Sequence, residues 1–211
     1  MNVYKCDQSM DSATMKYVKE AADRICDGEL VVYPTETVYG IAADVFNQKA
    51  VKDLYSVKNR PFDMPLSVAV ADKDMVENIA IMTSKVEKLV DAFLPGPLTI
   101  ITKKDSSVPD IVTSMSKKVG IRIPDNKIAL QLIKEVGGPI IATSANLHSH
   151  PDAVTVDAAV ADFGDKVNTY LDSGACTLGK PSTIVWIMDD EVEIIRQGAI
   201  TKQQIEDVLN A

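Results

Sequence analysis

The sequence predicts a single α/β domain built on a twisted mixed β-sheet with helices packed against it. Helical and strand-like hydrophobic patterns interleave along the chain, which is typical of this fold class. No linker, internal repeat or low-complexity stretch divides residues 1–211. One hydrophobic core can serve a chain of this length, since single cores keep growing to roughly 250–300 residues. We therefore expect one domain.

Helices are expected where apolar residues recur at spacings of three and four. Asp11 or Ser12 can cap the first of them, and Gly28 lies just past its end. Further helices are expected over 48–58, 86–93, 128–136 and 201–209, and the carboxylates of Asp72–Glu77 indicate a helix start. The LPGP segment at 94–97 must stop the third of these helices, because proline cannot continue one.

Strands are expected over short apolar runs that lie between turn residues. These runs are 30–33, 66–70, 98–104, 119–123, 140–144, 167–171, 182–188 and 191–196. The order of the strands in the sheet is left open.

The chain is acidic, because 22 basic and 30 acidic side chains give a net charge of −8. This balance argues against a broad nucleic-acid surface, although it is compatible with a local basic pocket. No apolar run approaches the roughly 20 residues needed to span a membrane, and the first residues lack the apolar core of a signal peptide. The three cysteines are too scattered for a disulfide framework or a CxxC metal site. We therefore expect a cytoplasmic protein without a membrane segment.

Polar segments adjoin several of the expected strands. PTETVYG (34–40) and TSAN (143–146) end two strands, and GKPSTIV (179–185) leads into a third. Ligands of open α/β sheets gather at strand ends, because the loops there present donors. Four cations also lie near strand or helix ends: Lys58, Arg60, Arg122 and Arg196. In an acidic chain they indicate a focused pocket for a triphosphate or a carboxylate, which guanidinium groups bind with two parallel hydrogen bonds.

Each of these features also has a purely structural interpretation. Thr35 and Thr37 could cap a turn, and Ser144 and Asn146 could shape another. Arg122 could point outward from a half-exposed strand, and the basic segment after residue 57 could be the solvated end of a helix. Taken together, the polar strand ends and the four nearby cations favour one anion pocket over a separate structural explanation for each feature.

Several familiar sites are absent from the sequence. There is no GxxxxGK[ST] phosphate loop, no GxGxxG after a strand and no set of residues resembling a Ser-His-Asp triad. His148 and His150 could in principle bind a metal ion. They are the only two histidines and no Cys or Asp cluster adjoins them, so we interpret them as loop residues and predict no metal site in the protein.

Seven motifs in order resemble those of the YrdC/Sua5/TsaC family, and together they span nearly the whole chain. They are VVYPTETVYGIAAD (31–44), KNRP (58–61) with PLSV (65–68), LPGPLTIIT (94–102), VGIRIP (119–124), IATSANL (141–147), PSTIV (181–185) and IIRQGAIT (194–201). The resemblance implies a twisted α/β sheet with a large concave, positively charged cavity. The length resembles the short, single-domain form of the family.

Members of this family are threonylcarbamoyl-AMP synthases, so the resemblance also implies an activity. The substrates would be L-threonine, bicarbonate and ATP, with magnesium carried on the ATP phosphates. The product is used by a downstream transferase to modify transfer RNA. No nucleophilic residue is required. One alternative is a module of the same fold that binds double-stranded RNA or transfer RNA without catalysis. A second alternative is a carbamoyl-handling enzyme, because a related domain occurs in carbamoyltransferases. Those carbamoyltransferases are much longer chains, which argues against this second alternative.

The resemblance assigns roles to ten residues. Thr35, Arg122, Thr143 and Ser182 would contact threonine, and Lys58, Arg60, Thr113, Ser144, Asn146 and Arg196 would contact ATP. Within the first set, Arg122 would clamp the threonine carboxylate. Two positions depart from the pattern, because Ala69 stands where some relatives have histidine and His150 stands where others have arginine.

Overall fold

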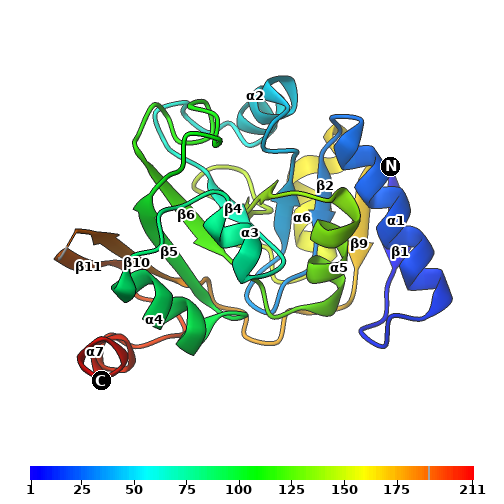
Figure 1. Cartoon of the computed structure of the whole chain (residues 1–211). Helices are drawn as coiled ribbons and strands as arrows, with labels where there is room; N and C mark the ends of the chain where they lie inside the picture. Colours follow the sequence, from blue (N-terminus) through cyan, green and yellow to red (C-terminus); the bar gives the residue numbers. More distant parts are fainter. Residues whose placement is uncertain (190) are drawn as a thin grey trace.

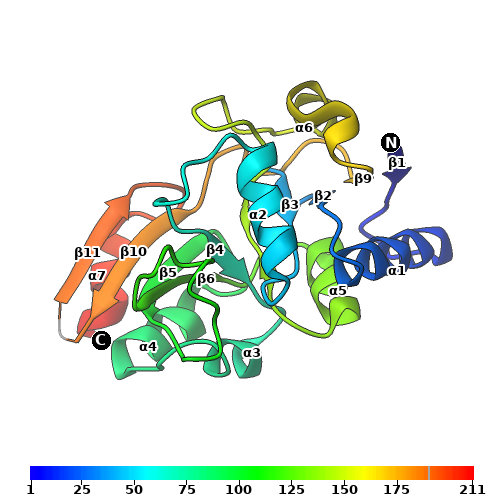
Figure 2. The same ribbon diagram turned by 90° about the horizontal axis from the view of Figure 1, so that it is seen from above.

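The computed structural model describes residues 1–189 and 191–211, and its strands form two mixed sheets flanked by helices (Figure 1). The α/β architecture is confirmed, but the strands divide between two sheets where the sequence analysis expected one. Figure 2 shows the larger sheet with α4 and α7 on one side of the molecule and the smaller sheet with α1 and α5 on the other.

The smaller sheet has the strand order β1-β9-β2-β3-β8. Its strands are β1 (Asn2–Lys5), β2 (Val31–Tyr33), β3 (Gly40–Ala42), β8 (Thr143–Ser144) and β9 (Thr169–Asp172). The pairs β1–β9 and β9–β2 are parallel, whereas β2–β3 and β3–β8 are antiparallel. The PTET segment therefore forms the connection of a β2–β3 hairpin.

The larger sheet has the strand order β11-β10-β5-β6-β4-β7. Its strands are β4 (Ser67–Ala69), β5 (Leu98–Lys103), β6 (Lys118–Arg122), β7 (Ile140–Ile141), β10 (Thr183–Met188) and β11 (Glu191–Arg196). Parallel pairs (β10–β5, β4–β6) alternate with antiparallel pairs (β10–β11, β5–β6, β4–β7). Residue 190, between β10 and β11, lies outside the described residues.

Residues 140–144 join the two sheets. The sequence predicts one strand here, but the structure divides it: β7 pairs with β4 of the larger sheet, and β8 pairs with β3 of the smaller one. Ala142 lies between them, and its N–H donates to the carbonyl of Ser67 at 2.7 Å. The chain thus passes from one sheet to the other within a few residues. This places the hydroxyl-bearing residues of β8, Thr143 and Ser144, where the two sheets meet.

Apart from the helix at 156–163, the helices of the described residues lie close to the predicted positions. They are α1 (Ser12–Cys26), α2 (Gln48–Val57), α3 (Lys73–Glu77), α4 (Ser84–Phe93), α5 (Lys127–Val136), α6 (Val156–Phe163) and α7 (Lys202–Asn210). Asp11 caps α1 by accepting from the N–H of Thr14 at 2.8 Å, as one of the two predicted caps. No helix among the described residues is long and apolar enough to cross a membrane.

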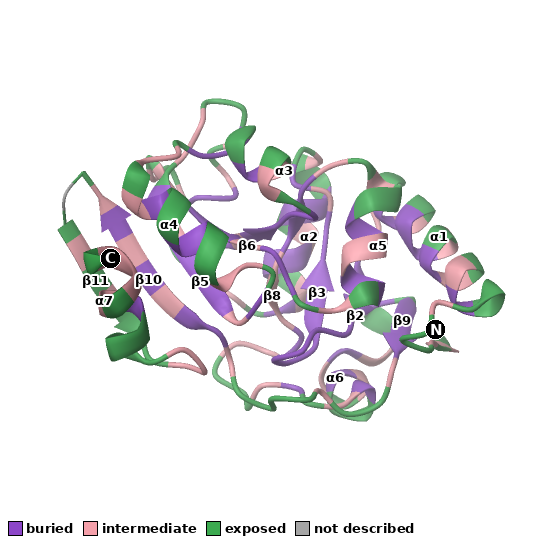
Figure 3. Cartoon of the chain, turned by 60° about the horizontal axis from the view of Figure 1, so that its bottom comes forward, coloured by how far each residue is buried: buried purple, intermediate pink, exposed green. Residues whose placement is uncertain are grey.

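The buried hydrophobic residues of the described chain form a core with three parts. One fills the space around both sheets, a second joins α1 and α5 to the smaller sheet, and a third packs α4 and α7 on β5 and β10. Figure 3 shows the central strands largely buried, β11 largely exposed, and the outer faces of α1, α4 and α7 exposed, as the three-to-four-residue patterns of these helices predict.

The sequence analysis missed β1, β3, α6 and a short 3-10 turn at Gly164–Lys166. β1 and β3 have only four and three residues, too few for an alternating pattern to stand out. β1 is a strand because it pairs with β9, more than 160 residues away. α6 has weak amphipathic character in a segment rich in alanine, VDAAVADF, although Thr155 caps it through the N–H of Ala158.

Candidate active site

A cavity of about 190 Å³ opens where the two sheets meet. Its walls come from the β2–β3 hairpin, the β7–β8 segment, the ends of β4 and β6, and the start of β10. Seven of the ten residues predicted to contact substrates line it: Thr35, Arg60, Arg122, Thr143, Ser144, Ser182 and Arg196. The structure therefore brings together residues that lie up to 161 positions apart, although their roles as substrate contacts remain predictions.

Arg122, at the end of β6, is held on two sides. Its Nε donates to the carbonyl of Gly96 at 3.3 Å, and its Nη2 lies 2.7 Å from Oε1 of Glu36. Both side chains of this ion pair are nearly buried, with 12% and 9% exposed. The pair is close but misaligned, since Arg122 Nη2 and both Glu36 oxygens lack hydrogen bonds of normal geometry among the described residues. The guanidinium is thus oriented by Gly96 and Glu36, in a side chain that lines the cavity.

Arg196 also lines the cavity and is anchored by the segment that leads into β10. Its Nε and Nη2 donate to the carbonyl of Ser182 at 3.1 and 2.9 Å, and the Ser182 hydroxyl lies 2.8 Å from that of Thr99. Burial lowers the pKa of Arg196, while Asp152 acts in the opposite direction. The β10–β11 hairpin therefore presents a hydroxyl and a guanidinium as one rigid unit.

Arg60 closes the cavity near the segment that follows α2. Its Nε donates to the carbonyl of Met64 at 3.2 Å and its Nη2 donates to that of Pro65 at 2.9 Å. Burial lowers its pKa as well. Because arginine stays charged far above neutral pH, all three guanidinium groups remain cationic in the cavity.

Thr35 serves the turn and the cavity together. Its hydroxyl donates to the carbonyl of Val38 at 2.6 Å and lies 2.9 Å from the hydroxyl of Thr37. The N–H groups of Thr37 and Val38 also point to it, at 3.2 and 3.3 Å. The turn-capping interpretation is therefore correct for this residue, which also lines the cavity. Its donor is engaged by Val38, so a ligand would meet it mainly as an acceptor.

Three predicted contacts do not line the cavity. Lys58 is 2% exposed, and its ammonium donates to the carbonyls of Ser144 and Asn146, the latter at 2.6 Å. Burial is the main reason that its pKa falls from 10.5 to about 7. Asn146 is also buried, with its amide donating to the His150 carbonyl at 2.6 Å. These two residues support the cavity wall from behind. The alternative interpretation of the basic segment as a solvated helix end does not hold for Lys58, which is internal.

Thr113 lies farther off, in the segment between β5 and β6. It is fully buried, its hydroxyl donates to the Ser116 carbonyl at 2.9 Å, and Lys104 Nζ lies 3.2 Å away. It is absent from the lining of the cavity. The structure gives this residue a structural role in its own loop, and its predicted contact with ATP has no geometric support.

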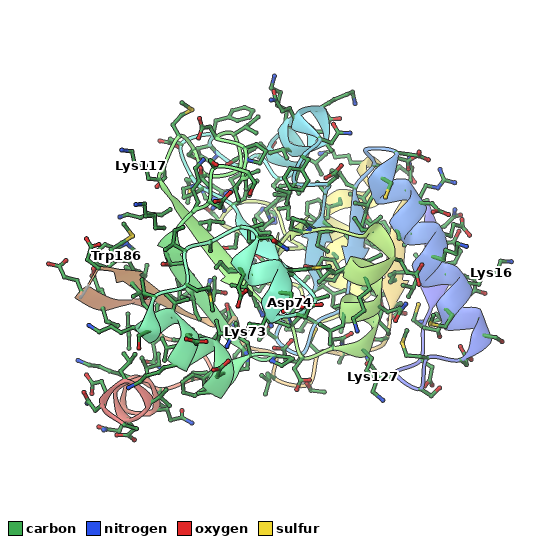
Figure 4. All side chains as sticks on the ribbon, viewed as in Figure 1. Lys16, Lys73, Asp74, Lys117, Lys127 and Trp186 are labelled. Atoms are coloured by element: carbon green, nitrogen blue, oxygen red, sulfur yellow. The ribbon has the colours of Figure 1, made fainter. Side chains whose placement is uncertain are left out.

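Charge is distributed unevenly between the surface and the cavity. Figure 4 shows Lys16, Lys117 and Lys127 projecting from the outside of the molecule, and each is exposed. Arg60, Arg122 and Arg196 instead converge on the cavity, where Asp152 is the one lining carboxylate among the described residues. A concave site rich in guanidinium groups in a chain of net charge −8 concentrates anions locally.

The histidine pair does not form a metal site with described neighbours. His150 Nδ1 lies 2.9 Å from Asp162 Oδ1, and no group of three or more His, Cys, Asp or Glu suited to a metal occurs in the described part of the chain. His150 therefore belongs to the loop after β8. Ala69, the other departure from the family pattern, does line the cavity.

Sequence reasoning missed several lining residues: Tyr33, Tyr39, Ser67, Thr99 and Asp152. Tyr33 and Tyr39 read as apolar parts of the β2–β3 hairpin, and Ser67 and Thr99 lie inside strands without a distinctive motif. Asp152 was obscured because an acidic side chain is unexpected in a pocket for anions. Its position after the TSAN segment was the only available signal.

A family model for Sua5/YciO/YrdC, described as telomere recombination, matches residues 23–198. The chain belongs to this family. A protein of Methanocaldococcus jannaschii is 38% identical over 97% of this chain and 95% of its own length. A threonylcarbamoyl-AMP synthase of Bacillus subtilis is also 38% identical, over 91% of this chain and 56% of its own length.

A solved member of the family agrees with the fold described above. The structure of Pyrococcus abyssi Sua5 complexed with L-threonine is 32% identical to this chain, with a TM-score of 0.94. The match covers 99% of this chain and 61% of the solved chain. This chain therefore spans little more than half of the longer Sua5/YciO/YrdC proteins, and nearly all of the M. jannaschii protein.

Proposed function

We propose that this protein is a threonylcarbamoyl-AMP synthase that forms threonylcarbamoyl-adenylate and pyrophosphate from L-threonine, bicarbonate and ATP. The observation that carries the proposal is the convergence of Arg60, Arg122 and Arg196 on one cavity in a chain of this family. A B. subtilis relative carries that activity in its name, and a P. abyssi relative was solved with L-threonine.

The reaction demands positioning more than a nucleophilic side chain. The threonine amine takes up bicarbonate with loss of water, giving a carbamate. A carbamate oxygen then bonds to the α-phosphorus of ATP as the bond to pyrophosphate breaks. Every reactant carries negative charge, so a cavity that gathers and aligns anions can supply much of the acceleration; positioning alone is worth about 7–11 kcal/mol in favourable cases.

The lining residues can be divided between the two substrates as the family resemblance implies. Arg122, beside the Thr35 turn, would bind the threonine carboxylate, with Thr143 and Ser182 nearby on the cavity wall. Arg60, Arg196 and Ser144 would face the nucleotide. Lys58 and Asn146 would act through the wall, because both hold the β8 segment without reaching the cavity.

Magnesium would arrive with ATP. The donor set fits such an ion, because magnesium usually keeps water and phosphate ligands and uses one or two protein carboxylates. Asp152 is the carboxylate available to it in the cavity, and the ion would neutralise phosphate charge. The Asp152 carboxylate also offsets part of the cationic charge around Arg196.

The proposal is tested by pyrophosphate release. Purified protein with Mg-ATP should release pyrophosphate only when threonine and bicarbonate are both present, and the adenylate should appear in the same samples. Pyrophosphate release at the same rate with and without threonine would contradict the proposal. Tight, strongly salt-dependent binding of double-stranded or transfer RNA without any pyrophosphate would instead favour the RNA-binding alternative. The downstream transferase remains a predicted partner.

The cavity should select threonine by its hydroxyl. Sites that hydrogen-bond a substrate hydroxyl reject analogues lacking it, because their own polar groups are left unpaired. The hydroxyls of Thr35, Thr143 and Ser182 line the cavity, and small Ala69 adds room. Serine, which lacks only the methyl group, should be used at a cost of about 1–3 kcal/mol. Valine should be much worse, and adenylate formation with each amino acid at matched concentration measures the difference. Equal adenylate formation with valine and serine would show that the cavity selects amino acids by shape and not by their hydroxyl group.

A further inference from the structure

Two tyrosines line the cavity, and their hydroxyl groups differ. The Tyr39 hydroxyl donates to the carbonyl of Gly174 at 2.7 Å and accepts from the N–H of Ser173 at 3.2 Å. The Tyr33 hydroxyl has no hydrogen bond to any described residue, although the side chain is 1% exposed. It is not among the fully enclosed unpaired atoms, so it opens onto the cavity that Tyr33 lines. Tyr33 therefore presents a free donor there.

Gly40 holds the Tyr33 ring in place. The two residues are direct partners in the antiparallel β2–β3 pair. A Cβ at Gly40 would lie 2.8 Å from Cε1 and Cζ of Tyr33 and 3.0 Å from its hydroxyl oxygen, distances that real Cβ atoms do not tolerate. The ring thus packs closely against the bare glycine backbone, and Tyr33 belongs to the buried core beside α1 and α5. The position of the hydroxyl is set by the sheet rather than by a flexible loop.

The surroundings suit donation to an anion. Burial raises the pKa of Tyr33, the positive charge of Arg122 opposes that rise, and the negative charge of Glu36 adds to it. The phenol stays protonated at neutral pH and can donate its hydrogen. Arg122 itself has its Nε engaged by Gly96 and one amino group beside Glu36, so its fork is only partly available. A carboxylate bound there has lone pairs left for a second donor.

We propose that the Tyr33 hydroxyl donates a hydrogen bond to the threonine carboxylate, beside Arg122, and is a substrate-binding residue of this enzyme. The inference rests on the proposed function, because it takes the cavity to hold threonine. The competing explanation is that Tyr33 is only a core residue, for which phenylalanine would serve equally well.

Tyr33→Phe is a sharp test, because it removes one oxygen and keeps the ring on Gly40. Threonine binding is measured by calorimetry, and KM for threonine and for ATP by pyrophosphate release. We expect the threonine Kd to rise about 10-fold, as loss of one hydrogen bond to a charged group implies, with the ATP KM within about twofold of wild type. An unchanged threonine Kd would overturn the proposal.

Tyr170→Phe is the matched control. Tyr170 is fully buried, and its hydroxyl donates to the Gly164 carbonyl at 2.8 Å outside the cavity. Its loss should leave the threonine Kd unchanged. If both variants weaken threonine equally, the effect is general and the proposal fails.

Comparison of threonine with valine separates the two ends of the amino acid. Tyr33→Phe should weaken both by the same factor, because they share the carboxylate. A loss confined to threonine would mean that Tyr33 reads the side-chain hydroxyl, and would overturn the assignment. If the wild type and Tyr33→Phe bind threonine and release pyrophosphate equally well, only this inference is contradicted. Wild-type protein that does neither would sink the proposed function.

Discussion

Arg122→Ala should raise the KM for threonine by about 10- to 100-fold and leave the KM for ATP nearly unchanged. The substitution removes a charge-assisted hydrogen-bonded pair worth roughly 1.5–3 kcal/mol. Arg122→Lys should not restore binding, because a point charge lacks the planar fork that grips a carboxylate. Pyrophosphate release at varied threonine and varied ATP measures both constants. Equal effects on the two substrates would contradict the assignment of Arg122 to threonine.

Arg122→Ala alone also leaves Glu36 buried without its partner. Breaking a buried ion pair on one side costs about 3–5 kcal/mol of folding free energy, so a poorly folded variant could mimic lost binding. The double variant Arg122→Met with Glu36→Gln removes both charges and should fold better than Arg122→Ala. It should still bind threonine weakly. If this folded double variant binds threonine as wild type does, Arg122 is not the carboxylate clamp.

Lys58→Met should destabilise the fold by about 2–4 kcal/mol near pH 9. Methionine matches the length of lysine but cannot donate, so the carbonyls of Ser144 and Asn146 lose their partner, at roughly 1–3 kcal/mol each. The β8 wall of the cavity should loosen, and ATP binding should weaken with it. Denaturant unfolding measures the stability, and Lys52→Met, at an exposed position of the same helix, is the matched control.

The stability difference between wild type and Lys58→Met should depend on pH. Burial depresses the pKa of Lys58 from 10.5 to about 7, so between these values the unfolded chain holds more protons than the folded one. Wild-type stability relative to the variant should therefore rise with pH from about 7 toward 10.5, by up to about 1.4 kcal/mol per pH unit. Below about pH 7 the cost of the buried charge is fully present. A difference that stays constant from pH 7 to 9 would mean that Lys58 keeps an ordinary pKa.

Local sequence was enough to place most elements. The helices at 12–26, 48–57 and 127–136 were expected because their apolar faces repeat at helical spacing and their caps are short-range features. The anion pocket is expected for a different reason: four cations near strand or helix ends, taken together in an acidic chain, favour a focused pocket. The family resemblance, carried by local motifs, is what named Thr35, Arg122 and Ser182 as threonine contacts.

Only the tertiary structure separated residues that face the cavity from residues that support it. Lys58 and Arg60 lie in one short basic motif, yet Arg60 lines the cavity and Lys58 turns inward to two carbonyls. The ion pair of Glu36 with Arg122 joins the turn of one sheet to a strand of the other, and Tyr33 packs on Gly40 because β2 and β3 are paired. Local sequence determines helices, turns and charge because these depend on neighbours along the chain. Burial, partner choice and the direction of a side chain depend on segments that meet only when the two sheets pack together.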